Sequence, residues 1–372
     1  MKKLIFFTVI FCITTTSFAQ LIKGPEIGID NRVTFKVYAP NAKEVKVINM
    51  SDSAAMGAKE YLMEDAGKGN WKVNTLPCRP GLHYYELSID GARVSDPSSP
   101  MYFGWAKWVS GLEVPDKNVD FYHVKDVPHG DVRIHWYFSK ITNSYRKCLV
   151  YTPSGYDLSL TKRYPVLYLQ HGSGESELGW TMQGKAGFIL DNLIAEGKAK
   201  PMIIVMDNGY APGPNAVNKY NPGGPENLFA DLVTKELVPM IDSQFRTLNN
   251  RENRAISGLS MGAGQAMNIG LGHPELFGSI GAFSGGGSRG SQFNVETSYS
   301  GVFKDAVKFN STTKLLFIGC GTLDGGYKSI KSFHEALTKH GINNVWSDPV
   351  GSHEWQVWRI HLYEFAQRLF KE

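Results

Sequence analysis

The chain has 372 residues, of which 39 are lysine or arginine and 35 are aspartate or glutamate, giving a formal net charge of +4. A chain of this length holds two domains or one large domain. The near balance of charge argues against nucleic acid or another polyanion as a partner, because such partners favour a strongly basic surface.

The first twenty residues have the pattern of a secretory signal peptide. A pair of lysines precedes an apolar run over residues 4–13, and a small-x-small cleavage site follows over residues 17–19. The apolar run is too short for a stable membrane anchor. We therefore expect residues 1–20 to be removed, and the mature chain to be secreted or periplasmic without a membrane association.

Three cysteines follow that segment, at Cys78, Cys148 and Cys320. Their number is odd, they lack Cys-x-x-Cys spacing, and two of them lie in strand-like runs, so buried thiols are expected rather than disulfides. Histidines and carboxylates are scattered without the spacing of a metal site. We expect no metal and no other cofactor.

Short alternating strands separated by turn signals extend from about residue 21 to 98. Val33–Val37, Val45–Val47 and His83–Leu87 each alternate with period two, and turns rich in glycine, proline or asparagine lie between them. The pattern predicts a small all-β sandwich over residues 21–98.

Residues 99–127 have no clear period, and we predict an irregular connector there. The segment contains Trp105 and Trp108. These side chains could stack on a sugar or could pack between the two domains. We expect the packing role, because a tryptophan in a connector usually contacts other side chains.

From about residue 128 to 372, apolar strands alternate with helical stripes, which predicts an α/β domain around a mainly parallel sheet. The buried strands are expected at residues 166–169, 202–206, 255–256 and 314–318. A terminal helix repeats apolar residues every three or four positions between Trp358 and Leu369.

The segment Gly258-Leu259-Ser260-Met261-Gly262 follows an apolar strand and precedes a helical pattern. This order is typical of the nucleophile elbow of an α/β-hydrolase, in which the flanking glycines permit a sharp turn. A second Gly-x-Ser-x-Gly copy around Ser288 lacks both the strand and the helix. We predict Ser260 as the nucleophile and Ser288 as a loop residue.

A serine nucleophile needs a base that is oriented by a third group, and in this fold the chain order is serine, acid, histidine. Asp324 follows a buried strand directly, whereas its rival Asp348 lacks a comparable strand before it. His353 lies in the last loop before the terminal helix. The predicted triad is therefore Ser260, His353 and Asp324.

Backbone amides should bind the oxyanion, one from Met261 and one from Gly172 or Ser173 after an early strand. We expect the adjacent His171 to hold that loop. The substrate site should be lined by Trp180, Tyr210 and Trp355, although these aromatic residues could instead close the core. A further tyrosine, Tyr220, lies in the loop that carries Tyr210.

Taken together, these motifs resemble carbohydrate esterase family one, the branch with feruloyl and acetylxylan esterases. The matching motifs are Arg146–Pro153, Tyr164–Gly172, Glu236–Pro239, Gly258–Gly264, Gly321–Asp324 and Gly351–Trp355. The resemblance covers residues 128–371 and implies a cofactor-free esterase that removes ferulate or acetate from plant xylan or its oligosaccharides.

The predicted sandwich resembles the immunoglobulin-like modules that precede many glycan-acting enzymes. The matching segments are Phe35–Ala42, Gly69–Trp71 and Pro80–Tyr85. The partner that the esterase resemblance implies is an acylated plant polysaccharide or oligosaccharide. Whether the sandwich itself binds glycan stays open, as does the oligomeric state. The alternatives are an esterase for a catecholate siderophore triester, and a glycan-binding protein with an inactive hydrolase domain.

Overall fold

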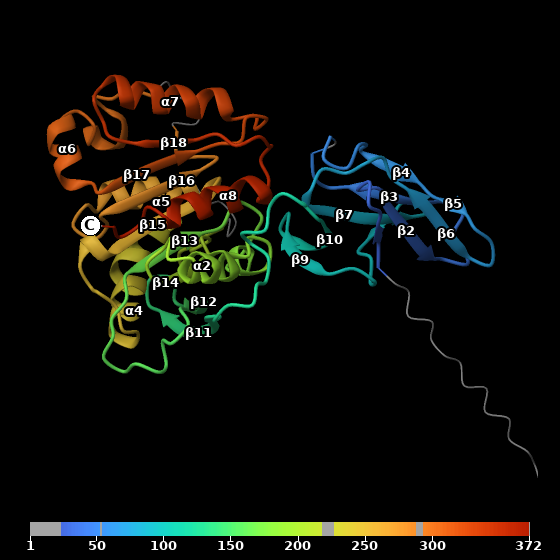
Figure 1. Ribbon diagram of the computed structural model, residues 1–372, viewed down its shortest axis with the longest axis horizontal. Helices are drawn as coiled ribbons and strands as arrows, with labels where there is room; N and C mark the ends of the chain where they lie inside the picture. The colour runs from blue at the N-terminus through green and yellow to red at the C-terminus, as the bar shows by residue number, and fades with distance from the viewer. Residues whose placement is uncertain (1–23, 53, 218–226, 288–292, 372) are drawn as a thin grey trace, which may run out of the picture.

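The computed structural model describes residues 24–371 except for residue 53 and the segments 218–226 and 288–292. The expected signal peptide over residues 1–20, Tyr220 and Ser288 lie outside the described residues. The described chain forms a pair of small β-sheets beside a larger α/β domain (Figure 1).

The first ten strands form the two small sheets. Their bounds are β1 (Glu26–Ile27), β2 (Val33–Tyr38), β3 (Val45–Asn49), β4 (Glu60–Leu62), β5 (Glu64–Asp65), β6 (Asn70–Asn74), β7 (Gly81–Ile89), β8 (Ala92–Val94), β9 (Met101–Gly104) and β10 (Lys107–Val114). One sheet has the order β1-β2-β6-β5, and the other has the order β4-β3-β7-β10-β9 with β8 paired to β7.

The alternating strands bury one face of each sheet, as their period predicts. Val33 and Phe35 of one sheet pack with Val45, Val47 and Tyr85 of the other in a common core. We call this unit the sandwich. Its relation to immunoglobulin-like modules stays a prediction.

The predicted connector over residues 99–127 is wrong between Met101 and Val114. These residues form the hairpin β9–β10, and β10 pairs antiparallel with β7. The turn residues Trp105 and Ala106 lack the Asn-Gly or Asp-Gly signal of a two-residue hairpin, which is why the sequence did not reveal it. The packing role expected of the tryptophans is also wrong, since Trp105 is 61% exposed and Trp108 is 47% exposed.

The α/β domain contains one eight-stranded sheet. Its strands are β11 (Asp131–Ser139), β12 (Ser144–Thr152), β13 (Val166–Gln170), β14 (Ile203–Asp207), β15 (Arg254–Leu259), β16 (Ser279–Phe283), β17 (Leu315–Gly319) and β18 (Val345–Ser347), in the order β11-β12-β14-β13-β15-β16-β17-β18. The pairs formed by β12 are antiparallel, and the remaining pairs are parallel. The expected α/β class is confirmed.

Helices cover both faces of this sheet, as the continuous apolar strands predict. The helices are α1 (Gly179–Met182), α2 (Ala186–Ala195), α3 (Phe229–Asp231), the π-helix η1 (Leu232–Leu237), α4 (Val238–Gln244), the 3-10 helix η2 (Arg251–Asn253), α5 (Met261–Gly272), the 3-10 helix η3 (Ser298–Gly301), α6 (Ala306–Thr312), α7 (Tyr327–Lys339) and α8 (Trp355–Ala366). α4, α5, α6 and α7 share one core with the sheet, and α1, α2 and α8 share the other. Cys78, Cys148 and Cys320 are free thiols and are buried, as predicted.

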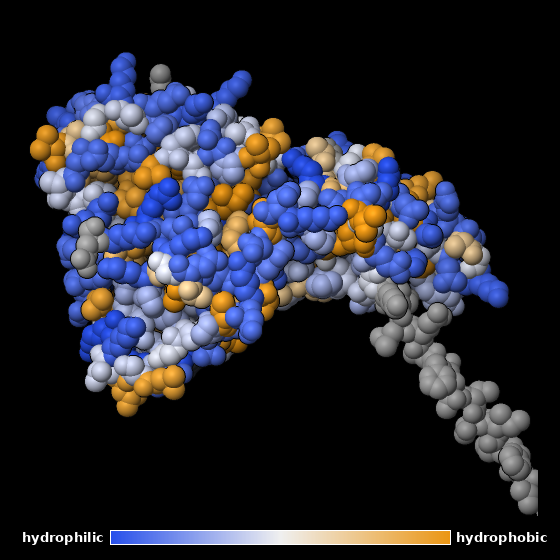
Figure 2. Space-filling view, viewed as in Figure 1, coloured by the Kyte–Doolittle hydropathy of each residue, from blue (hydrophilic) through white to orange (hydrophobic). Residues whose placement is uncertain are grey.

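Among the described residues, no helix has the length and apolar character needed to cross a membrane. The face shown in Figure 2 is mostly hydrophilic over both domains, with apolar residues in scattered patches.

A buried arginine joins the two domains. Arg359 of α8 forms a two-pronged ion pair with Glu113 of β10, at 2.6 and 2.9 Å, and its guanidinium lies 4.4 Å from the ring centre of Tyr122. It also donates two hydrogen bonds to the carbonyl oxygen of Gln183. Burial acts to lower the pKa of Arg359, but the bonds and charge of Glu113 raise it above its usual value. The first turns of α8 are thereby fixed against the sandwich.

Replacing Glu113 with glutamine should destabilise the protein by about 2 kcal/mol, because the buried guanidinium of Arg359 loses its counter-charge. Denaturant unfolding followed by tryptophan fluorescence measures the change. The control Asp30→Asn removes an exposed ion pair to Arg32 and should change stability by less than about 0.5 kcal/mol. Equal losses in the two variants would contradict a special role for the buried pair.

Candidate active site

The predicted functional residues follow four parallel strands of the large sheet. Loop 171–175 follows β13, Ser260 follows β15, Asp324 comes after β17, and His353 comes after β18. Carboxyl ends of parallel strands lie at one edge of a sheet, where ligands usually bind in α/β folds. The topology therefore brings these segments to a common edge.

Ser260 occupies a strained turn between β15 and α5. Its backbone has φ 51° and ψ −110°, a region that residues with a side chain rarely adopt. A Cβ atom on Gly258 would lie 2.6 Å from the Gly262 backbone, and a Cβ atom on Gly262 would lie 2.6 Å from the His171 carbonyl oxygen. Both glycines are required by this close packing, as expected of a nucleophile elbow.

His353 and Asp324 form a hydrogen-bonded pair. His353 Nδ1 lies 2.7 Å from Asp324 Oδ2, and the imidazole packs edge-on against Trp358 with ring centres 5.0 Å apart. Burial acts to raise the pKa of the Asp324 carboxyl, but the bond and charge of His353 and the Gly326 amide hold it below its usual value. The rival acid Asp348 instead accepts a hydrogen bond from the Tyr327 hydroxyl at 2.8 Å.

Ser260 and His353 line one pocket of about 560 Å³. The full lining comprises Met50, Ser51, Asp52, Leu82, Tyr84, Trp105, Gly172, Ser173, Glu175, Leu259, Ser260, Leu323, Gly325, Ser352, His353, Glu354, Trp355 and Trp358. The side chains of Ser260 and His353, both within the described part of the chain, are not hydrogen-bonded to each other. Such bonds are often long without substrate and tighten in the complex.

The structure reduces the number of backbone amides that could bind an oxyanion. The Gly172 amide donates to Glu175 Oε2 at 3.0 Å, so it already has an acceptor, and it is not retained as a free oxyanion donor. Met261 is the first residue of α5, where an amide has no acceptor within the helix. The Ser173 amide, on the exposed tip of the loop, is left as its partner.

His171 holds the loop that follows β13, as expected. Its Nδ1 donates to the Gly172 carbonyl oxygen at 2.7 Å, and its Nε2 accepts from the Gly209 amide at 2.9 Å. Burial lowers the pKa of His171 to about 4, so the ring is neutral at physiological pH. A buried neutral imidazole with both nitrogens bonded is a structural residue.

The three aromatic residues expected at the substrate site have different positions. Trp355 lines the pocket and donates from Nε1 to the Tyr84 hydroxyl at 2.9 Å. Trp180 is buried behind it, with ring centres 5.3 Å apart, and bonds to the Gln170 carbonyl oxygen. The substrate role of Trp180 is therefore corrected to a core role. Tyr210 lies outside the pocket lining, and its hydroxyl accepts from the Gly174 amide at 2.7 Å, which supports the loop 171–175.

The sandwich supplies a wall of the pocket that the sequence did not predict. Met50, Ser51, Asp52, Leu82 and Tyr84 line it from the β3–β4 loop and β7, and Trp105 lines it from the β9–β10 turn. Their contribution depends on how one domain docks on the other, and local sequence patterns carry no such signal.

Asp52 also fixes the loop of the predicted base. Its Oδ2 accepts from Ser352 Oγ at 2.7 Å and from Arg79 at 2.8 Å. The hydrogen bond from Ser352 is the main reason why the pKa of Asp52 lies below its usual value. Because Ser352 directly precedes His353, the sandwich holds the imidazole loop in place.

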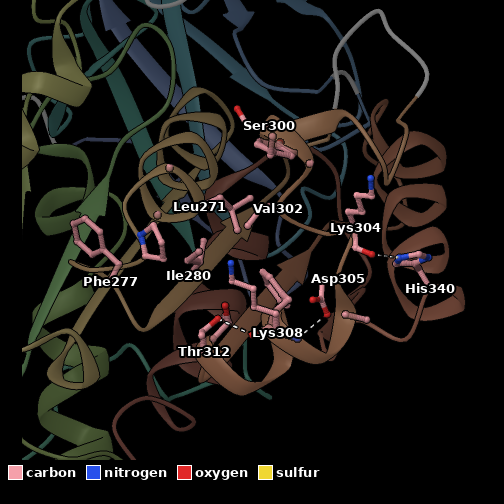
Figure 3. Close-up of a pocket in the computed structure, with 18 of the residues that line it drawn as sticks. Leu271, Phe277, Ile280, Ser300, Val302, Lys304, Asp305, Lys308, Thr312 and His340 are labelled. Carbon is pink, nitrogen blue, oxygen red and sulfur yellow. Dashed lines mark hydrogen bonds between the residues drawn. The ribbon is translucent and has the colours of Figure 1, made fainter.

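A larger cavity of about 1100 Å³ lies elsewhere in the α/β domain (Figure 3). None of the nine predicted site residues, all of them described, is among its lining. Two of its polar groups are used locally, since Asp305 accepts from the Lys308 amide and His340 contacts the Lys304 carbonyl oxygen. Within the described ranges there is also no cluster of three or more His, Cys, Asp or Glu residues that could hold a metal ion.

The fold and the edge-of-sheet site define an α/β ester hydrolase. Residues 139–369 match the sequence family described as "Putative esterase", and the chain belongs to this family.

One relative is a protein of Xylanibacter ruminicola named endo-1,4-beta-xylanase/feruloyl esterase, 38% identical over 93% of this chain. The chain spans 46% of that protein's length.

Solved structures agree with the family. A ferulic acid esterase of Anaeromyces mucronatus, determined with ferulic acid, is 30% identical and has a TM-score of 0.59, covering 68% of this chain and 96% of that one. The enterobactin esterase of Shigella flexneri is 18% identical with a TM-score of 0.65, covering 95% of this chain and 98% of that one. At that identity the second likeness shows the fold alone, and it extends over the sandwich as well.

Glu175 is an unusual carboxyl group in the pocket. It is buried, its Oε2 accepts a hydrogen bond from the Gly172 amide at 3.0 Å, and the Trp355 side chain is another polar neighbour. Burial raises the pKa of Glu175 to about 8. The side chain is therefore protonated at neutral pH, which keeps a negative charge away from the amides that would bind an oxyanion.

Replacing Glu175 with glutamine should remove a pH dependence of stability. Because the folded pKa is raised from 4.5 to about 8, the folded state keeps a proton that the unfolded state loses. Wild-type stability should fall relative to the variant by up to about 1.4 kcal/mol per pH unit as the pH rises through this window. Thermal melts from pH 5 to 8.5 measure the difference in Tm. The exposed control Glu335→Gln should show a constant difference, and a constant difference for Glu175→Gln would contradict the raised pKa.

Proposed function

We propose that this chain is a serine esterase with Ser260 as nucleophile, His353 as base and Asp324 as the residue that orients the base. The observation that carries the proposal is the short hydrogen bond between Asp324 and His353, because His353 lines the same pocket as the strained Ser260. A carboxylate at Nδ1 keeps the proton on that nitrogen and leaves Nε2 as the proton acceptor.

The reaction follows from these roles. Ser260 Oγ attacks the ester carbonyl while His353 takes its proton, and the amides of Ser173 and Met261 bind the oxyanion. Collapse of the tetrahedral intermediate breaks the ester bond, and His353 returns the proton to the leaving alcohol. Water, activated by the same imidazole, then releases the acid from the acyl-enzyme.

The proposed substrates are feruloyl and acetyl esters on plant xylan or its oligosaccharides. The names of the xylanase/feruloyl esterase relative and of the ferulic acid esterase structure support this substrate class. The pocket adds a physical reason, because Trp355 and Trp358 give it an apolar aromatic side suited to a planar acyl group. We further propose that residues 1–20 direct export, so that the enzyme meets its polymer outside the cytoplasm.

A second candidate is the hydrolysis of a catecholate siderophore triester. The observation that favours it is the enterobactin esterase fold, which covers the sandwich as well as the α/β domain. Both candidates use the same nucleophile, so direct assays on the two substrates decide between them.

Release of ferulate and acetate from arabinoxylan, intact and xylanase-digested, tests the proposal. Wild type should release at least one acid, and Ser260→Ala should lower the rate by about four orders of magnitude, because the acyl-enzyme can no longer form. Chromatography of the two acids measures the release and shows which ester is preferred.

The matched control is Ser288→Ala, which alters the second Gly-x-Ser-x-Gly copy and should leave the rate unchanged. Loss of activity in the control, or retained activity in Ser260→Ala, would refute the assignment of the nucleophile. Hydrolysis of the siderophore triester together with inertness toward arabinoxylan would select the second candidate.

A further inference from the structure

The pocket around Ser260 has two chemically different parts. Trp355, Trp358 and Leu259 are buried and come from the α/β domain, whereas Trp105 is 61% exposed and comes from the sandwich. A planar acyl group can be enclosed by the buried part. The sugar of a polymeric ester must stay at an open edge, because the chain continues into solvent.

Trp105 is held in an unfavourable backbone conformation. The pairing of Gly104 with Lys107 leaves Trp105 and Ala106 as the two residues of the hairpin turn, and both have positive φ, 56° and 60°. Turns of this kind strongly prefer Asn-Gly or Asp-Gly, and a bulky side chain at positive φ is a true outlier. Burial of the indole does not offset the cost of this backbone conformation, since the side chain is mainly exposed.

The same turn is hydrogen-bonded to the loop 171–175, which carries the proposed oxyanion donor. The Ala106 amide donates to the Gly174 carbonyl oxygen at 2.7 Å, and a Cβ on Gly174 would lie 3.2 Å from Trp105 Cα. Ser173, the proposed oxyanion donor, directly precedes Gly174. The backbone of Trp105 is therefore held at a fixed position beside the loop that carries Ser173, and a strained, exposed residue at such a position is a candidate for function.

From this geometry we propose that Trp105 forms a glycosyl subsite, which binds the sugar of the ester by stacking on its apolar face. The electron-rich face of an indole attracts the C–H groups of a sugar ring, and its edge can remain in water. The inference rests on the proposed esterase activity and extends it: the sandwich recognises the alcohol half of the substrate as part of the active site.

The test compares two esters of the same acid, a feruloylated arabinoxylo-oligosaccharide and methyl ferulate. Wild type should have a higher kcat/KM for the sugar ester. Trp105→Asn removes the indole and places in the turn a residue that favours positive φ, so the variant should fold with an undiminished Tm. It should lower the ratio of the two kcat/KM values by about tenfold, mainly through KM.

Two further variants sharpen the result. Trp105→Phe keeps an aromatic face and should retain part of the ratio. Trp108→Ala removes an exposed tryptophan of the same hairpin that does not line the pocket, and should leave the ratio unchanged. An unchanged ratio in Trp105→Asn, or an equal fall in Trp108→Ala, would overturn the subsite.

The wild-type enzyme alone separates failure of the subsite from failure of the proposed function. Hydrolysis of methyl ferulate without any gain from the sugar overturns the subsite and leaves the esterase intact. Hydrolysis of neither ester overturns the proposed feruloyl esterase and the subsite with it.

Discussion

The ion pair between Arg359 and Glu113 is the contact on which the two-domain site depends. Arg359 lies in α8, which begins two residues after His353, and Glu113 lies in β10 of the sandwich. Separating the domains would break the two charge-assisted hydrogen bonds that Glu113 accepts from this guanidinium. The ion pair therefore fixes α8, which follows His353, against the sandwich, which supplies one wall of the pocket. Figure 1 shows one end of α8 directed toward the sandwich, and the chain leads from there toward the C-terminus.

Three departures from the local rules of chain conformation lie at or beside the pocket. Ser260 has a strained backbone, and Trp105 and Ala106 form a turn without glycine. Glu175 is a carboxyl group whose burial raises its pKa. Other residues with positive φ, such as Lys68, lie outside the pocket lining, so a positive φ alone does not mark the site. At the pocket these departures coincide with residues that line it or adjoin its loops, as is common at functional sites.

Much of the architecture was predictable because it depends on local pattern. The period of the early strands gave the sandwich, and the strand–elbow–helix order singled out Ser260. Chain order and strand ends were enough to nominate Asp324 and His353, which the structure places 2.7 Å apart. Each of these inferences uses residues that are close in sequence or that meet at one sheet edge by topology.

Other features depend on contacts between distant segments, and these were missed. The β9–β10 hairpin lacks the usual turn residues, so its pairing with β7 was not visible. Glu175 accepts the hydrogen bond of the Gly172 amide, and Trp180 packs behind Trp355. Both contacts depend on side-chain positions, which the spacing of residues in the sequence does not specify. The docking of the sandwich, which makes Asp52, Tyr84 and Trp105 part of the pocket, is the largest feature of this kind.

Covalent labelling by a fluorophosphonate probe tests the central claim most directly, because the probe reacts with a serine only where a base activates it. The account predicts one adduct per chain, located on Ser260 by peptide mass spectrometry, with much slower labelling when Asp324 is replaced by asparagine. An unlabelled protein, an adduct on another serine, or an unchanged rate in Asp324→Asn would contradict it.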